Sequence, residues 1–414
     1  MSIPARRIVL FYKNLICRGG AERLFVKEYQ YLSLLGYEVF MITYRLEQQA
    51  LFGVTITSPS LIVLRQTGIR AILELVRTLR RLGNPPLLCS SGHLDVFLAS
   101  LFGGFEYALH IHQPCFMSFN DYDKYSVFLR RHFDIYTRSN FGAARFVEIR
   151  KSLSVGQRIG KNVRSLLSIG AKRRSRCNFV LSHYAQKEKR DLYGIHSLVL
   201  CGALDDDFHI SMRNAGLTGR RGEASTERPF TLLTVARLDI NKRIDELIRA
   251  TALLVQAGKH VRLLIVGDGP EQAALSALAR EIGLQDTVEF LGFVPDEGLS
   301  EIYARSHLFV SIDWADYKLT LFESLARGLP VLVSDETECD KRLLALGYVR
   351  AIPPLAGQVA QAIKSFMDNP VGVAPDLLTP ILQDYTWGSY FTKIALALAN
   401  AGLVARPANG PVSP

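Results

Sequence analysis

Two cationic side chains, Arg237 and Lys242, follow an apolar run at residues 231–235 that is typical of a buried β-strand. Guanidinium and ammonium groups donate charge-assisted hydrogen bonds to phosphate oxygens. Because ligands of open α/β sheets bind at the carboxyl ends of the strands, this spacing indicates a phosphate or diphosphate site. The alternative is a pair of ordinary surface charges.

A short helix expected at residues 319–327 supplies the next candidates. The backbone N–H groups at its start, around Lys318, Leu319 and Thr320, favour an anion. Glu323 lies one turn inside the helix and is placed to face the same ligand. Its spacing from Thr320 is also that of a capping box, which requires no ligand.

Glycine turns follow two other expected strands. Gly267 and Gly269 form one turn, and Gly19 with Gly20 forms the other. Glycine lets the backbone approach a ligand closely, although a tight turn alone also explains it.

His112 follows the strand-like residues 107–111. It is a candidate for ligand contact, and the alternative is a loop histidine satisfied by the protein itself. His110 is expected to point into packing or toward the opposite face.

Short apolar runs alternate with helices of 10 to 15 residues through both halves of the chain, as in parallel α/β sheets. A chain of 414 residues exceeds one ordinary core. We expect an N-terminal domain at residues 1–213, a linker at 214–228 and a C-terminal domain at 229–383. A last helix, at 384–405, is expected to pack back on the N-terminal domain.

The composition is that of a soluble globular protein, with 48% apolar and 21% charged residues. Its six cysteines are scattered without a C-x-x-C pair, which argues against a zinc site or a disulfide framework. No apolar run reaches the length of a membrane-spanning helix, and no signal peptide is visible. We expect a cytoplasmic protein without a bound metal.

Positive charge is concentrated at residues 124–176, where 14 Lys and Arg residues face only Asp134 and Glu148. Apolar residues are interleaved with these charges, so part of the segment is expected to form a basic amphipathic helix. Such a helix binds the surface of an anionic membrane. A solvated face is the plain alternative. Nucleic acid is not favoured, because no RNA-binding signature accompanies the segment.

Six pieces of the sequence, in order, resemble the retaining glycosyltransferases of family 4, and the resemblance covers nearly the whole chain. The pieces are Gly19-Gly20-Ala21-Glu22-Arg23, Ser182 with the following helix, Arg237 with Lys242, Val266-Gly267-Asp268-Gly269-Pro270, Phe290-Leu291-Gly292-Phe293-Val294, and Glu323-Ser324-Leu325-Ala326-Arg327-Gly328-Leu329-Pro330-Val331. The resemblance implies the α/β GT-B fold, in which two Rossmann-like doubly wound parallel-sheet domains face each other across a cleft.

The resemblance also implies roles in the second half of the chain. Arg237 and Lys242 would bind the donor diphosphate and stabilise the leaving nucleotide. Glu323 would hold the ribose hydroxyls. The base would be bordered by backbone at residues 292–294, which are Gly292, Phe293 and Val294.

In the first half, the resemblance places His112 near the reacting sugar. Gly19 and Gly20 would close over the phosphates or shape the acceptor site. The family uses cationic side chains and a helix dipole in place of a metal ion, so neither a metal nor a cofactor is expected beside the donor.

The chain departs from the family just before Glu323. The first glutamate of the Glu-x₇-Glu motif falls on Ala315, and Asp316-Tyr317-Lys318 replaces the usual Gly-Phe-Gly. We expect Asp316 to contact the donor-sugar hydroxyls instead, with Asp313 as the alternative.

These features predict a metal-independent retaining glycosyltransferase, peripheral at the inner face of the cytoplasmic membrane, that acts on a lipid-linked or glycan acceptor. The Gly-Gly-Ala-Glu-Arg loop looks like that of lipid-linked mannosyltransferases and favours GDP-mannose, with UDP-sugars open. Ala315 and Lys318 motivate a rival, a non-catalytic GT-B-like subunit that binds a nucleotide sugar. A GT-B epimerase or phosphorylase is disfavoured by the order of the motifs and by the lack of an obvious pyridoxal-phosphate lysine motif.

Overall fold

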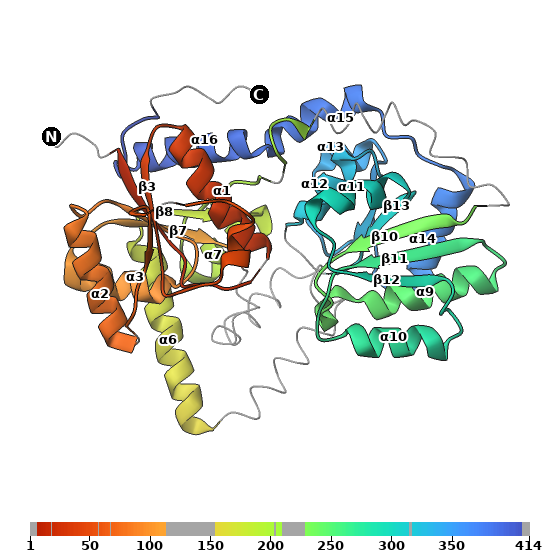
Figure 1. Ribbon diagram of the computed structural model, residues 1–414, viewed down its shortest axis with the longest axis horizontal. Coiled ribbons are helices and arrows are strands. Elements are labelled where there is room, and N and C mark those ends of the chain that lie inside the picture. The colour runs from red at the N-terminus through yellow and green to blue at the C-terminus, as the bar shows by residue number, and fades with distance from the viewer. Residues whose placement is uncertain are drawn as a thin grey trace. The chain divides into compact units, whose positions relative to one another are not determined.

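The computed structural model describes residues 6–17, 19–56, 58–66, 68–112, 154–202, 204–208, 228–313 and 317–407 (Figure 1). Within its helices, the side chains of residues 158, 161, 162, 165, 192, 296 and 297 are not described. The chain divides into two compact units, one of Met1–Gly202 with Trp387–Pro414 and one of Ala203–Thr386. Each unit contains a parallel sheet with helices on both faces, which confirms the expected pair of doubly wound α/β domains.

The first unit is built on a seven-stranded sheet in the order β5-β3-β1-β6-β7-β8-β9. Its strands are β1 (Arg7–Phe11), β3 (Glu38–Thr43), β5 (Leu61–Val63), β6 (Leu87–Cys89), β7 (Tyr107–Ile111), β8 (Cys177–Val180) and β9 (Leu198–Val199). All neighbouring pairs are parallel. The short strands β2 (Asn14–Leu15) and β4 (Arg45–Leu46) pair beside this sheet.

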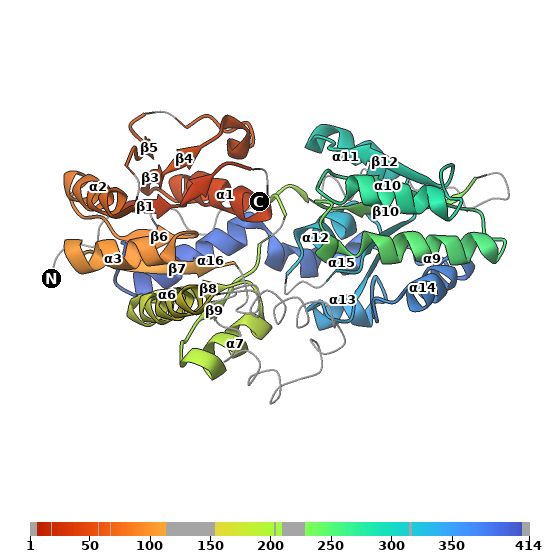
Figure 2. The same cartoon turned by 90° about the horizontal axis from the view of Figure 1, so that it is seen from below.

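Helices cover both faces of the first sheet. On one face lie α2 (Gly68–Arg81), α3 (His93–Gly103) and α6 (Val155–Arg174), and α3 packs against the other two (Figures 1 and 2). On the other face, α1 (Gly20–Leu34) packs against β1, β3 and α16 (Trp387–Asn400). The helix α7 (His183–Tyr193) connects β8 to β9.

The second unit has a six-stranded sheet in the order β12-β11-β10-β13-β14-β15. Its strands are β10 (Phe230–Val235), β11 (Val261–Val266), β12 (Val288–Gly292), β13 (Leu308–Ser311), β14 (Val331–Ser334) and β15 (Val349–Ile352). The strand order reverses between β10 and β13. In doubly wound sheets the crevice for a ligand forms outside the carboxyl ends of the strands at this reversal.

The strands of the second sheet are apolar along both faces because helices bury both. One face carries α9 (Ile244–Gln256), α10 (Gln272–Glu281) and α14 (Ala356–Asp368). The other carries α11 (Asp296–Ala304), α12 (Leu319–Ala326), α13 (Lys341–Ala345) and α15 (Pro375–Leu382). Within β10, Leu232 packs into the first of these layers and Leu233 into the second.

The boundary between the units lies before Leu204, earlier than the predicted end of the N-terminal domain at residue 213. Leu204 forms an isolated parallel bridge with Thr386, and it packs with Phe208 in the core of the second unit. The predicted linker at 214–228 lies outside the described residues except for Arg228.

The C-terminal helix α16 belongs to the first unit. Trp387 and Phe391 are fully buried there, and the Phe391 ring stacks on Tyr31 of α1 with 5.3 Å between centroids. Among the described residues, no helix is both long enough and apolar enough to cross a membrane.

Candidate functional site

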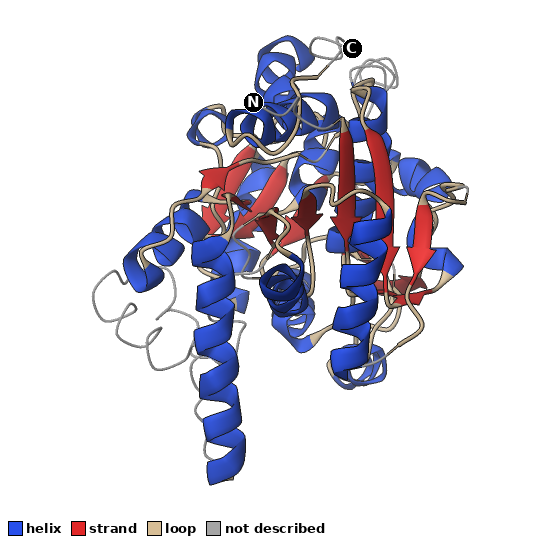
Figure 3. Cartoon of the chain, turned by 90° about the vertical axis from the view of Figure 1, so that its left-hand side faces the viewer, coloured by secondary structure: helices blue, strands red, loops and turns tan. Residues whose placement is uncertain are grey.

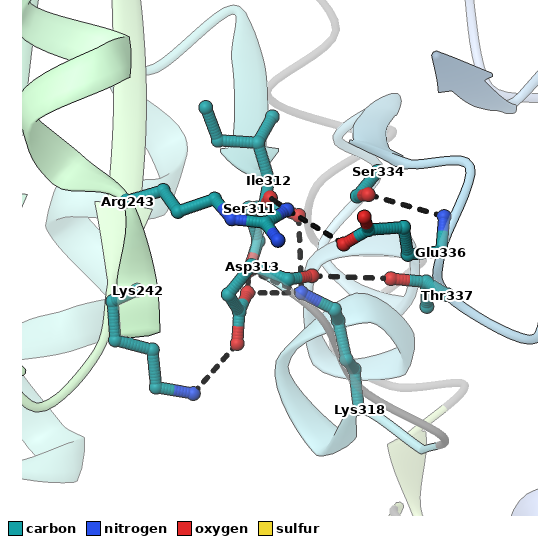
Figure 4. A network of polar contacts seen from close by, with 9 residues as sticks. All are labelled: Lys242, Arg243, Ser311, Ile312, Asp313, Lys318, Ser334, Glu336 and Thr337. Carbon is teal, nitrogen blue, oxygen red and sulfur yellow. Dashed lines mark hydrogen bonds and ion pairs between the residues drawn. The ribbon is translucent and has the colours of Figure 1, made fainter. Parts of the chain in front are cut away.

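Lys242, Asp313 and Lys318 form a charged cluster at the carboxyl ends of β10 and β13 (Figure 4). Lys242 ends the 3₁₀ turn Ile240–Lys242 after β10, and Asp313 lies two residues beyond the end of β13. The Lys242 ammonium donates to Asp313 Oδ2 at 2.7 Å, while Asp313 Oδ1 accepts from Lys318 and from Ser311 Oγ. The cluster therefore lies at the point where the strand order of the second sheet reverses.

Lys318 is the N-cap residue of α12, and its ammonium group points back under the helix toward the sheet. Only 4% of its side chain is exposed. The predicted capping box is wrong, because α12 begins at Leu319 and Thr320 therefore lies inside the helix. The N-cap position is taken by a residue whose side chain bonds the end of β13 instead of the first turn.

A second ion pair lies directly beside this cluster. Arg243 adopts the left-handed conformation (φ 52°), which is uncommon for a residue with a Cβ atom. Its guanidinium donates to the Ile312 carbonyl at 3.2 Å and meets the fully buried Glu336 carboxylate at 2.7 Å. The two contacts hold the turn between β10 and α9 against the ends of β13 and β14.

The cluster fixes the ionisation of Asp313. Burial alone would raise the pKa of this carboxyl, but Lys318 and Lys242 together hold the pKa well below its usual range. Burial lowers the pKa of the Lys318 ammonium, and Asp313 opposes that shift. Asp313 is thus a buried carboxylate whose two oxygens both accept hydrogen bonds from the protein.

Arg237 is separate from this cluster. Its guanidinium is largely exposed, and its Nε lies 3.3 Å from Asp239 on the same turn. The two predicted phosphate-binding cations thus differ: Lys242 is anchored to the sheet, whereas Arg237 extends into solvent beside its own acidic neighbour.

Gly267 and Gly269 are required by backbone packing at the same edge. Gly267 has φ +122°, and a Cβ atom there would collide with the carbonyl of Ala236, while a Cβ atom on Gly269 would collide with the backbone of Leu238. The amide of Leu238 donates to the Asp268 carbonyl at 2.8 Å. The glycine turn thus lies directly on the loop that carries Arg237 and Lys242.

The remaining donor-site candidates of this unit lie at its carboxyl edge. Gly292 (φ +64°) ends β12, Phe293 is 52% exposed and Val294 packs at the margin of the core. Glu323 is half-buried on α12, one turn from its start. Ala315 and Asp316 lie outside the described residues, so the predicted contact of Asp316 stays a prediction.

In the first unit, Gly19 is the N-cap of α1 and Gly20 is its first residue. A Cβ atom on Gly19 would collide with the Glu22 carboxylate, which accepts hydrogen bonds from Tyr12 Oη at 2.9 Å and Cys17 Sγ at 3.3 Å. The glycine therefore leaves room for this carboxylate at the carboxyl end of β1.

His112 lies just beyond β7, and both of its ring nitrogens are buried. Neither nitrogen has a hydrogen-bond partner within the described part of the chain. Burial, followed by the neighbouring His110 and His93, holds the pKa of His112 well below its usual range, so its imidazole is neutral at pH 7. A neutral imidazole offers one donor and one acceptor.

Behind His112 is a buried polar chain that the sequence analysis missed. His110 is fully buried as expected, but its ring lies on the same side as His112, at 4.2 Å between centroids, and not on the opposite face. Its Nδ1 lies 2.7 Å from Glu28 of α1, and its Nε2 lies 2.7 Å from Tyr390 Oη of α16. Ser90 after β6 also donates to Glu28. Only the apolar neighbours of Glu28 in sequence hinted at its burial.

Part of the sequence, which falls within the second unit, matches the model of a known protein family. Residues 218–377 match the model of Glycosyl transferases group 1. The chain therefore carries a glycosyltransferase group 1 domain, and the matched range contains the whole Lys242–Asp313–Lys318 cluster.

Two curated relatives align with a part of the chain. One is the alpha-monoglucosyldiacylglycerol synthase of Streptococcus pneumoniae, 30% identical over 32% of this chain and 31% of its own length. The other is the mannosylfructose-phosphate synthase of Agrobacterium fabrum, 36% identical over 25% of each chain. The match spans less than a third of either relative.

A likeness in fold covers most of the chain. The Anabaena protein HepE, solved in complex with UDP and glucose, matches with a TM-score of 0.65 and 16% identity, over 95% of this chain and 99% of that one. Together with the two parallel-sheet units, this likeness shows the GT-B fold.

Proposed function

We propose that this chain is a glycosyltransferase that moves a sugar from a nucleoside diphosphate to an acceptor hydroxyl in the synthesis of a cell-envelope polysaccharide or glycolipid. The observation that carries the proposal is Lys242. Its ammonium is anchored by Asp313 beside the start of α12, at the strand reversal of a glycosyltransferase group 1 domain. A cation and a helix N-terminus at one sheet edge are suited to a diphosphate.

In this proposal, different residues of the second unit bind different parts of the donor. Lys242 and Arg237 bind the diphosphate, and the backbone at the start of α12 adds N–H donors. Glu323 binds the ribose, and the exposed segment from Gly292 to Val294 borders the base. The positive charge at the diphosphate comes from side chains, so the transfer proceeds without a metal ion or a further cofactor.

The transfer itself retains the anomeric configuration. The acceptor oxygen bonds to the anomeric carbon as the bond to the leaving phosphate breaks, and the acceptor proton passes to that phosphate on the same face of the sugar. The neutral imidazole of His112, which has no hydrogen-bond partner among the described residues, exchanges hydrogen bonds with the sugar hydroxyls, with Asp316 as a further contact. Gly19 and Gly20 leave space for the phosphates or the acceptor.

The donor we favour is GDP-mannose, on the likeness of the Gly19–Arg23 loop to that of lipid-linked mannosyltransferases. UDP-sugars are the alternative, and HepE was solved with UDP. A thermal-shift screen of GDP, UDP and ADP with their sugars tests both. A ligand at a hundred times its Kd stabilises the native state by about 2.7 kcal/mol.

The matched variants for this screen are Lys242→Gln and Lys259→Gln. Lys259 lies before β11, at the opposite edge of the same sheet, and pairs with Asp368. We expect the nucleotide-dependent shift to be lost in the first variant and kept in the second. If no nucleotide shifts the wild-type transition at millimolar concentration, the donor site is refuted.

Hydrolysis and transfer assays separate the enzyme from its rival. Slow release of sugar from the bound donor, or transfer to a membrane extract, supports the enzyme. Donor binding with neither reaction supports the non-catalytic subunit. That alternative is based on Ala315, which stands where the resembling family has its first glutamate.

We further propose that the chain is a cytoplasmic protein that acts at the inner face of the membrane, on a lipid-linked acceptor. The N-terminal part of α6 extends away from the first unit (Figures 1 and 3). It exposes a stripe of apolar side chains at helical spacing, namely Val155, Ile159, Val163, Leu166 and Leu167. The helix carries six Lys and Arg and no acidic residue. An apolar stripe with flanking cations fits an anionic bilayer.

Co-sedimentation with vesicles tests this surface. Wild-type protein should bind vesicles of phosphatidylglycerol more tightly than vesicles of phosphatidylcholine, and Ile159→Gln with Val163→Gln should weaken binding about tenfold or more. The control, Leu253→Gln, changes an exposed residue of α9 in the other unit. Equal binding by the α6 variant and the wild type would refute the proposed surface.

A further inference from the structure

The buried side chains of Asp313 and Lys318 are not placed to contact a ligand directly. The Lys318 ammonium donates to the Ser311 carbonyl at 3.0 Å, to Ser311 Oγ at 2.9 Å and to Asp313 Oδ1. An ammonium group has three donors, so all are used. With 3% and 4% of their side chains exposed, both charges are inside the protein.

Lys242 differs from Lys318 in both respects. About a third of its side chain is exposed, at 31%, and its ammonium bonds Asp313 Oδ2 as its only partner within the described ranges. Two of its donors are thus left for solvent or a ligand. It is the one member of the cluster placed to contact an anion.

The charges of the cluster decide how strongly an anion is attracted. A pair of Asp313 and Lys242 alone would carry no net charge, and the carboxylate would repel a diphosphate that approached the ammonium. Lys318 adds a second positive charge on the other oxygen of Asp313. The adjacent Arg243 and Glu336 offset each other, so the cluster as a whole carries one net positive charge, located at its exposed end.

We propose that Lys318 is a positioning residue that offsets the charge of Asp313, so that Asp313 can anchor Lys242 without cancelling its attraction for a diphosphate. The inference rests on the proposed function and assigns to Lys318 an electrostatic task with no ligand contact by its side chain.

The test measures the affinity of the full chain for inorganic pyrophosphate and for UDP and GDP by calorimetry in low salt. Lys318→Met keeps the length of the side chain but leaves Asp313 to neutralise Lys242, so we expect affinity to fall about tenfold. The double variant Asp313→Asn with Lys318→Met removes both buried charges and restores the net charge on Lys242. We expect it to bind within about threefold of the wild type.

Two controls separate this charge effect from damage to the fold. Lys259→Met removes one positive charge from the same unit at the amino edge of the sheet, and should leave affinity unchanged. The double variant should keep its melting temperature, because exchanging a buried ion pair for neutral groups of similar volume is often neutral. The single variant, with one buried charge left less compensated, should melt lower.

The recovery of affinity in the double variant is the decisive measurement. Binding by the double variant that is as weak as that of Lys318→Met would overturn the proposal, because the double variant has the net charge of the wild type at this cluster. Wild-type affinity in Lys318→Met would overturn it as well. If the wild-type chain binds none of the three probes, the proposed donor site fails and this inference fails with it.

Discussion

Replacing Glu28 by glutamine should make the first unit more stable at alkaline pH. Glu28 is fully buried beside His110, Ser90 and Tyr390, and burial raises its pKa from the ordinary 4.5 to about 8, with the Ser90 hydrogen bond opposing. At a pH between these two pKa values, the folded protein therefore keeps a proton on Glu28 that the unfolded chain has released. A group of this kind stabilises fully below pH 4.5, and its contribution falls as pH rises toward 8.

The size of the effect follows from the two pKa values. Each pH unit between them lowers the free energy of unfolding by about 1.4 kcal/mol, so the loss approaches an upper limit of about 5 kcal/mol near pH 8. His110 acts in the opposite direction but at lower pH, because burial lowers its pKa to about 3. Glutamine has the shape and the hydrogen-bonding groups of the protonated acid. Glu28→Gln should therefore match the wild type near pH 4.5 and exceed it increasingly toward pH 8.

Guanidinium unfolding of the wild type and the variant from pH 5 to 8.5 measures this difference, with the buried Trp387 of the same unit as a fluorescent reporter. Glu38→Gln is the matched control, because Glu38 lies in the same sheet with 55% of its side chain exposed. Its effect should stay within about 1 kcal/mol. A constant destabilisation by Glu28→Gln across the whole range would show that Glu28 is ionised in the native protein, and would refute the reasoning.

Three further substitutions test other parts of the two units. Gly267→Ala should destabilise by roughly 2–4 kcal/mol in urea unfolding, because the residue has φ +122° and a methyl group would meet backbone; a neutral effect would mean that the turn can move. Tyr390→Phe should cost about 1–2 kcal/mol and leave His110 Nε2 without its partner, as an altered histidine resonance in NMR would report. Arg243→Met should cost about 3–5 kcal/mol because Glu336 is left buried and unpaired, and adding Glu336→Gln should recover most of that loss in the same unfolding assay.

Much of the architecture was predictable because it depends on local patterns. Local patterns gave β7 with its observed bounds, and β10 and α12 to within one residue. Among the elements that were missed, α3 and α15 have local reasons. The helix α3 is apolar nearly throughout and lacks a clear amphipathic period, and α15 contains Pro380 inside it.

The candidate site was predictable only in part. Residues next to strand ends, such as Lys242 and Gly267, were found because the carboxyl edge of a parallel sheet is a general place for ligands. Glu336 and Glu28 were not found. Each becomes important through a partner distant in sequence, Arg243 for the first and His110 for the second.

The sequence by itself determined which residues lie at the carboxyl edge of each sheet, because strand periodicity and turn glycines act over a few residues. Only the tertiary structure decided how their charges are arranged. The start of α12 is an example. Thr320 and Glu323 have the spacing of a capping box, yet Lys318 takes the N-cap position, and its side chain donates hydrogen bonds to Asp313 and Ser311. A buried carboxylate requires a positive partner from wherever the fold supplies one, and that requirement outweighed the local preference of the helix end.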